Sequence, residues 1–463
     1  MCTKVPAADS GLSAVVDAPA AAPTRRNFVL GILNGTVGAV AMDFMHPELI
    51  LGGLIYALTE SPMLVALVTI INKAGALVPQ LFVSGHAEHL PRKRPIYVIM
   101  TVVRAAAGVG LVLAIWMLAR GVNPMTLGLF FGVFLVAQVS GGSGHVVFLD
   151  MTGRLIRHDL LGRFLGLREL VGGSLSLVAG LLVVQRVLER YELPHNYTVL
   201  AAVGVVLSTT AMLMLCAWRE APGPRARRRT TLRESVERGM RWLRSDHNYR
   251  LYFWLRVAFR VNYMALAFFI PYGAERLTRA GGAVGVAVLG GVLVATFKLS
   301  RVLSSLYWGR LADHAGYRSC LVGAGIGFTL APLLALLAPE LPAAFTVGIP
   351  LTRVVLDLPL CVFLGALATL GVGFQGSVIG GQRFLIVGAP AHRRISYGGF
   401  LNTLTSPLTL LPLAGGLVVR YLGAGTLFVA LVGGGVLYLI TASRMIPERA
   451  AEPDGPSRHA SAP

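Results

Sequence analysis

The sequence predicts an all-α integral membrane protein with twelve transmembrane helices in two similar six-helix bundles. Three observations predict this fold: composition, the spacing of apolar runs, and an internal repeat. Of 463 residues, 55% are hydrophobic and only 14% are charged, and the mean hydropathy is +0.68. A soluble domain carries about 25% charged residues. The net charge of +19 does not indicate nucleic-acid binding, because the basic residues lie between apolar runs and form no basic domain.

Apolar runs of the length needed to cross a bilayer, about 20 residues, recur along the whole chain. The expected spans are 27–47, 61–83, 96–119, 125–149, 166–186, 196–218, 251–273, 283–307, 318–338, 360–387, 399–419 and 424–444. They divide the chain into a first bundle (27–218), a linker (219–250) and a second bundle (251–445), with tails at 1–26 and 446–463 expected to be disordered.

The loops between these spans differ in charge from one side of the membrane to the other. One side holds Arg92, Lys93, Arg94, Arg154, Arg157, Arg163, the arginine-rich linker, Arg310, Arg318, Arg393 and Arg394, and the other side holds only Arg120, Arg186, Arg190, Arg276, Arg279 and Arg420. Because Lys and Arg accumulate in cytoplasmic loops, we expect both termini in the cytoplasm and the protein in the plasma or inner membrane.

The linker contains the pattern of a surface helix. Thr231 and Glu234 have the spacing of a capping box, and apolar residues follow on one face of the expected helix: Leu232, Val236, Met240 and Leu243. We expect this helix to lie on the cytoplasmic membrane surface and to tether the two bundles.

The two halves of the chain repeat each other. At an offset of 225 residues, 87–89 (AEH) aligns with 312–314 (ADH), and Lys73 aligns with Lys298, although the chain has only four lysines. Further along, the offset becomes 236, so the second half carries about 11 extra residues, which we place in the connection 341–358. Such repeats are typical of transporters built from two bundles around a central pathway.

The segment GRLADHAGYR (309–318) follows the eighth expected span. It resembles the signature loop G-x-L-A-D-x-x-G-x-[RK] of the major facilitator superfamily, and the matching residues are Gly309, Leu311, Ala312, Asp313, Gly316 and Arg318. The sister loop SGHAEHLPRKR (84–94) departs from the pattern at Ser84, Glu88 and Pro91, and Lys93 takes the place of Arg318. The resemblance covers about residues 27–445 and implies a secondary transporter that works by alternating access.

In this superfamily such loops hold the cytoplasmic gate closed, so the resemblance implies gating roles for Glu88, Lys93, Gly309, Asp313, Gly316 and Arg318. An anion is stabilised at a helix N-terminus. We therefore expect Asp313 at the start of the eleventh span, near Gly398, and Glu88 at the start of the fifth, near Arg163.

Several charged residues fall inside expected spans. Lys73 lies about ten residues, roughly 15 Å, from the cytoplasmic end of its helix, and Lys298 should lie at the same depth. Arg104 and Arg260 lie nearer the cytoplasm, and Asp43 is the clearest intramembrane acid. Charged residues inside a membrane usually mark a substrate or ion pathway.

Because cations outnumber acids here, we expect an anionic or carboxylate-bearing substrate, with Lys73 and Lys298 as anchors, Arg260 and Arg104 as auxiliaries, and Asp43 in the same site. A lysine can titrate whereas a guanidinium hardly does, so a coupled proton is a further possibility. The structural alternative is an ion pair between Lys73 and Asp43, with Lys298 bonded to a backbone carbonyl or reaching toward the cytoplasm.

Two other functions stay open: a proton-coupled exporter of hydrophobic or cationic compounds that uses Asp43, and a membrane sensor or assembly protein without transport. No catalytic constellation, cofactor motif or metal-ligand set can be assembled from the sequence, so we expect no enzyme. The expected partners are a small molecule and the lipid bilayer, and a monomer is expected.

Overall fold

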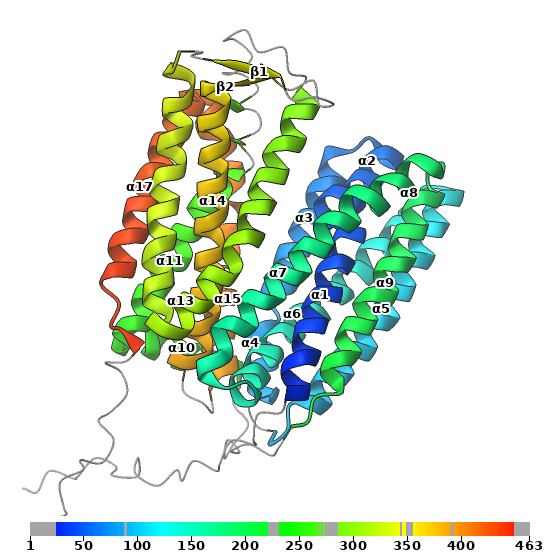
Figure 1. Cartoon of the computed structure of the whole chain (residues 1–463). Helices are drawn as coiled ribbons and strands as arrows, with labels where there is room; N and C mark the ends of the chain where they lie inside the picture. The colour runs from blue at the N-terminus through cyan, green and yellow to red at the C-terminus, as the bar shows by residue number, and fades with distance from the viewer. Residues whose placement is uncertain are drawn as a thin grey trace, which may run out of the picture.

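The computed structural model describes residues 25–87, 90–220, 231–266, 268–269, 272–273, 286–342, 345–348, 355–389 and 393–448. Its helices form two bundles, one from α1 to α9 and one from α11 to α17 (Figure 1). The bundles approach each other at the end that holds α4, α10 and α15, and they spread apart toward α2 and β1 (Figure 1). We call the end with α4, α10 and α15 the closed end.

The first bundle contains helices that run from one end of the molecule to the other, several of them with short irregular turns. They are α1 (Arg25–Phe44), η1 (Pro47–Leu51), α2 (Gly52–Thr59), α3 (Pro62–Leu77), α4 (Gln80–Ala87), α5 (Arg94–Arg120), α6 (Pro124–Leu155), η2 (His158–Leu160), α7 (Leu161–Ala179), η3 (Gly180–Val184), α8 (Gln185–Arg190) and α9 (His195–Cys216).

The linker helix α10 (Leu232–Ser245) precedes the second bundle. That bundle contains α11 (His247–Met264), α13 (Val286–Leu337), η4 (Ala338–Glu340), β1 (Thr346–Gly348), β2 (Val355–Asp357), α14 (Leu358–Arg383), η5 (Phe384–Gly388), α15 (Arg394–Leu404), η6 (Ser406–Leu410), α16 (Leu411–Leu422) and α17 (Ala424–Ser443).

Local sequence signals set several helix starts. Asn123 caps α6 by accepting hydrogen bonds from the N–H groups of Met125 and Thr126, both at 3.0 Å, and Pro124 follows at the first helical position. Asp357 caps α14 in the same way, 2.8 Å from the Leu360 nitrogen. A polar cap followed by proline satisfies free N–H groups and favours helical geometry.

The number of spans agrees with a multi-pass membrane fold. Within the described ranges, nine helices are long and apolar enough to cross a membrane, and a tenth arises if α15 and the η6–α16 segment, bent by 41°, form one span. Helix α13 is one of these nine helices, but Gly316 breaks its helical backbone. Helix α13 therefore contains both the eighth and the ninth expected span. The seventh span lies partly outside the described residues, and the total of twelve stays a prediction.

The connection 341–358, in which we expected the extra residues of the second half, contains regular structure. In the connection 341–358 the structure has a two-stranded antiparallel sheet, in which Thr346 pairs with Asp357 and Gly348 with Val355. This sheet lies at the end opposite the closed end (Figure 1).

The predicted linker helix is present as α10, and its capping box is confirmed. The Thr231 side chain accepts from the Glu234 nitrogen at 3.2 Å, and the Glu234 side chain accepts from the Thr231 nitrogen at 3.1 Å. Gly239 faces Phe400 of α15 so closely that a Cβ atom there would lie 2.2 Å from the ring. Helix α10 therefore packs on α15, as well as on α4 and α11.

Candidate functional site: a central cavity and the contact that closes it

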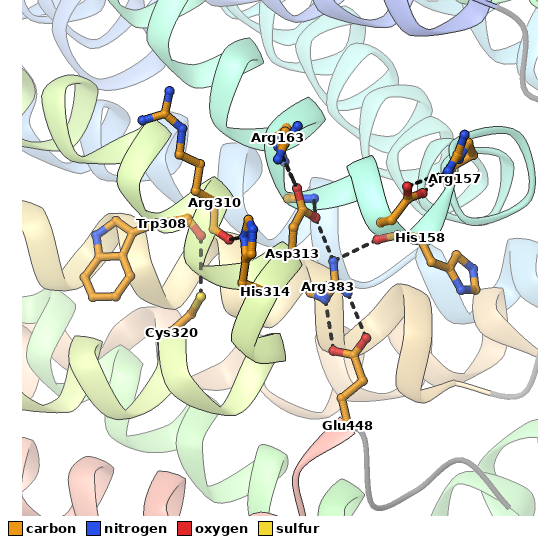
Figure 2. Close-up of polar contacts among 12 residues, drawn as sticks. Arg157, His158, Arg163, Trp308, Arg310, Asp313, His314, Cys320, Arg383 and Glu448 are labelled. Carbon is orange, nitrogen blue, oxygen red and sulfur yellow. Dashed lines mark hydrogen bonds and ion pairs between the residues drawn. The ribbon is translucent and has the colours of Figure 1, made fainter. Parts of the chain in front are cut away.

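Asp313 joins the two bundles at the closed end. Its carboxylate accepts hydrogen bonds from two backbone N–H groups at the start of α7, from Gly162 at 2.6 Å and from Arg163 at 2.8 Å. The helix dipole of α7 adds to this attraction because its positive end points at the carboxylate. Figure 2 shows Asp313 between Arg163 and Arg383.

Arg383, at the end of α14, extends this contact. Its guanidinium donates to Asp313 at 3.0 Å, to the carbonyl of His158 at 3.1 Å and to both Glu448 oxygens at 2.8 and 3.0 Å (Figure 2). The side chains of Arg383 and Asp313 are only 5% and 3% exposed. Two carboxylates and one carbonyl therefore satisfy a cation that would be costly to bury alone.

Small residues let α7 and α13 touch backbone to backbone beside this network. A Cβ atom at Gly162 would lie 2.2 Å from the Gly309 carbonyl oxygen, and one at Gly166 would lie 2.6 Å from the Ser305 carbonyl oxygen. Small residues four apart on both helices permit such close packing. We refer to Gly162, Gly166, Ser305, Gly309, Asp313 and Arg383 as the latch.

The predicted partner of Asp313 was wrong: the carboxylate binds the start of the fifth span at Gly162 and Arg163, not the eleventh near Gly398. The physical reason is connectivity. The eleventh span belongs to the same bundle as Asp313, so a contact there would not hold the two bundles together.

Glu88 lies outside the described residues, so its predicted partner at the fifth span stays untested. The helix before it, α4, and the end of α3 do contact the eleventh span. Asn402 of α15 donates to the Gln80 side chain at 2.7 Å, and Thr403 donates to the Leu77 carbonyl at 3.2 Å. The first bundle thus contributes α4 to this contact at the closed end, and the second bundle contributes α15.

The other predicted gating residues support the loops around the latch. Lys93 is fully buried and donates to the carbonyls of Ala87 and Leu90, while its own N–H donates to Glu220 at 2.8 Å. Arg318 donates to the Ser443 carbonyl at 2.6 Å. Gly316 has φ +74°, a conformation that favours glycine, and it makes the turn after Asp313.

A cavity of about 680 Å³ lies toward the interior from the latch. Most of its lining comes from α1, α5, α6, α7 and α9 of the first bundle, and only Lys298, Arg301, Val302 and Gln382 come from the second. Four lining residues are Lys or Arg and two are Asp or Glu: Arg104, Arg168, Lys298, Arg301, Asp43 and Glu169. A volume of this size is typical of a small-molecule site.

Asp43 and Lys298 form an ion pair across the two bundles. The Lys298 Nζ atom lies 3.3 Å from Asp43 Oδ1 and 3.4 Å from Oδ2, and the Ser176 hydroxyl also donates to Asp43. The alternative prediction of an ion pair between Lys73 and Asp43 was therefore wrong, because Lys298 is the lysine that binds Asp43.

Lys73 also reaches across to the opposite bundle, but outside the cavity lining. Its Nζ atom lies 5.9 Å from the ring centre of Tyr263 on α11, a cation–π contact. Arg260 lies on the same helix, α11, and is absent from the residues that line the cavity. Of the five predicted binding residues, the structure brings Asp43, Arg104 and Lys298 together.

Sequence reasoning missed Arg168. The fifth span was expected to begin at residue 166, which put Arg168 at a helix end, whereas α7 begins at Leu161. Arg168 thus lies two turns inside the helix, where it donates to the Gly31 carbonyl at 2.7 Å and lies over the Phe148 ring at 4.6 Å.

Comparison with known proteins gives similarity in fold. No family model matches the sequence, and no curated protein matches it either. Among solved structures, a bacterial homologue of the iron transporter ferroportin in an outward-facing state has a TM-score of 0.66 and 15% identity over 90% of this chain and 98% of its own. The fucose:proton symporter of E. coli has a TM-score of 0.65 and 14% identity, covering 90% and 97% of the two chains.

A human organic anion transporter is similar as well, with a TM-score of 0.62 and 14% identity over 90% of this chain and 99% of its own. Each of these three structures thus matches 90% of the chain. Solved structures of the major facilitator superfamily are among the matches, so the chain has the fold that the resemblance implied.

Proposed function

We propose that the protein is a secondary active transporter that moves a small anionic, carboxylate-bearing molecule across the cell membrane by alternating access. The observation that carries the substrate class is the charge of the cavity, in which four cations face two acids. A surplus of positive charge inside a membrane is stabilised by water or by a bound anion. The solved structures of similar fold are transporters, and one of them is an organic anion transporter.

The orientation follows from the loops. The closed end carries α10, with Arg233, Arg238, Arg241 and Arg244, and the sequence puts most of the other loop Lys and Arg residues on this side, so we propose that it faces the cytoplasm. The structure then represents an outward-facing state, with the latch closed on the cytoplasmic side. Opening the latch and closing the opposite end would carry the cavity to the cytoplasm.

Export of a lipophilic cation is the second candidate, because Asp43 lines the cavity. Two donors already occupy this carboxylate, Lys298 and Ser176, and a cation would have to displace Lys298. The anion model needs no such exchange. A coupled proton belongs to either model, with the Asp43–Lys298 pair as its candidate site.

The test uses the full chain in detergent. Thermal unfolding is measured with acetate, lactate, succinate, benzoate and inorganic phosphate, and with tetraphenylphosphonium as the cationic probe. We expect a carboxylate to raise Tm in the parent and to raise it less at the same concentration in Lys298→Ala, and the same carboxylate to enter proteoliposomes. If only tetraphenylphosphonium stabilises the protein, the export model replaces ours, and a carboxylate that binds but never crosses the membrane would favour a sensor.

A further inference from the structure

The charges that line the cavity fall into two paired sets and one unpaired set. Lys298 is paired with Asp43 at 3.3 Å, and Arg301 is paired with Glu169 at 3.5 Å. For Arg104 and Arg168 no ion pair within 4.0 Å exists among the residues that the structure describes. The surplus of the cavity therefore lies on these two guanidinium groups, both in the first bundle.

Both guanidinium groups are held in place by neutral groups. Arg104 donates to the Ala137 carbonyl at 3.0 Å, and Arg168 donates to the Gly31 carbonyl at 2.7 Å. Gly141 provides the space for Arg104, because a Cβ atom there would collide with the guanidinium nitrogen. A guanidinium carries five N–H donors in a rigid fork, so each arginine keeps donors for a ligand after bonding its carbonyl.

The cavity changes character along the helices that carry these arginines. On α5, Arg104 lies about 15 Å from the closed end, and Leu111 lies about 10 Å further on. On α6, which runs the opposite way, Gly141 lies level with Arg104 and Phe134 lies about 10 Å beyond it. Leu111 and Phe134 are 3% and 2% exposed and line the cavity.

Other apolar side chains continue this wall: Met45, which directly follows α1, Leu51 of η1 and Val205 of α9. The unpaired cations of the cavity thus lie toward the closed end, and away from it the lining is mostly apolar apart from His46 and the mutually neutralised Asp43–Lys298 pair. An acetate-sized anion would neutralise the arginines and leave the apolar part empty. A long neutral molecule would fill the apolar part and leave two cations without a counter-ion.

We infer that the cavity of the first bundle binds an amphipathic monocarboxylate, with its carboxylate on Arg104 and Arg168 and an apolar body about 10 Å long against Leu111 and Phe134. This inference rests on the proposed transport of anions and specifies their class. It also makes the site asymmetric, because the second bundle contributes only Lys298, Arg301 and two neutral residues.

The experiment measures binding of acetate, butanoate, hexanoate and octanoate to the detergent-solubilised full chain by isothermal titration calorimetry. Burying one methylene tightens binding roughly fourfold, so Kd should fall stepwise from butanoate to octanoate. Octanol, which has the same body without the charge, should bind at least about tenfold more weakly than octanoate.

Arg104→Gln and Arg168→Gln should each weaken octanoate binding and leave octanol unchanged. Arg120→Gln is the matched control, because Arg120 lies on the same helix but stacks on Trp116 at 3.5 Å, away from the cavity lining. If a variant fails to fold, the affinities of the unmodified protein for the four carboxylates and for octanol test the inference without it.

The outcomes separate this inference from the proposed function. Equal affinity for acetate and octanoate would overturn the amphipathic class and leave anion transport standing. Equal affinity for octanol and octanoate would show that the arginines do not recognise the ligand. If no carboxylate binds at all, both the inference and the anion model fall.

Discussion

The latch makes a quantitative prediction for Gly162→Ala. The added Cβ atom would lie 2.2 Å from the Gly309 carbonyl oxygen and 2.8 Å from the Asp313 carboxylate, whereas ordinary contact begins at 3.4 Å. Helices α7 and α13 would have to separate by about 1 Å. The hydrogen bonds from Gly162 and Arg163 to Asp313, now 2.6 and 2.8 Å, would then exceed the range of a hydrogen bond.

The energetic consequence follows from the charge on the acceptor. A hydrogen bond to a charged group contributes about 1.5–3 kcal/mol, so the loss of two destabilises the closed latch by about 3 kcal/mol or more. In a two-state equilibrium, 3 kcal/mol changes the ratio of the states roughly 150-fold. The variant should therefore populate a state in which the closed end has opened.

Electron–electron double resonance between spin labels measures this shift, in a background with the four native cysteines replaced. One label pair, at Arg157 and Arg310, reports on the closed end. The other, at Val122 and Glu340, reports on the opposite end, and all four positions are exposed. We expect the first distance to lengthen and the second to shorten.

Gly128→Ala is the matched control, because a Cβ atom at Gly128 would meet nothing within 4 Å. It should leave both distances as in the parent. If Gly162→Ala also leaves them unchanged, the backbone contact between α7 and α13 does not govern closure, and the latch argument is wrong.

Three more predictions use other contacts. Arg383→Gln leaves the buried Asp313 and the half-buried Glu448 without this cation, and because removing one partner of a buried pair costs about 3–5 kcal/mol, Tm should fall and the distribution of the closed-end label distance should broaden. Lys298→Ala should weaken binding of the stabilising carboxylate on the order of tenfold, since it leaves Asp43 unneutralised in the cavity, whereas Lys73→Ala should change it less than threefold; calorimetry that gives the reverse order would contradict the cavity assignment. Gly239→Val should push α10 off α15, and limited trypsin digestion should then cut the linker faster than in the parent.

Much of the fold could be predicted because a membrane imposes a strong pattern on sequence. Apolar runs mark the spans, arginines mark one side, and the repeat marks two bundles. The signature loop could be found from the identity and spacing of its residues alone, and the capping box of α10 could be found from Thr231 and Glu234. The errors arose for residues whose partners lie in the opposite bundle. No sequence pattern shows which helix N-terminus binds the Asp313 carboxylate.

The candidate site was predicted only in part, and the repeat explains why. Duplication places Lys73 and Lys298 at equivalent positions, and both reach the opposite bundle, but their environments differ: Lys298 meets a carboxylate and Lys73 meets an aromatic ring. A matched position in the sequence fixes the depth and direction of a side chain, while its chemistry depends on the residue that faces it.

The same reasoning separates the latch from the cavity. The closed end uses equivalent elements from both halves, with α13 on α7 and α4 on α15, because closing two bundles requires contacts from each. A ligand imposes no such symmetry, since it needs only one complementary wall. In our proposal the first bundle supplies that wall with Arg104 and Arg168, and the second bundle adds the acid-paired Lys298 and Arg301 to the lining of the same cavity. For the alternating access that we propose, this asymmetry would let one bundle hold the ligand while the other bundle moves.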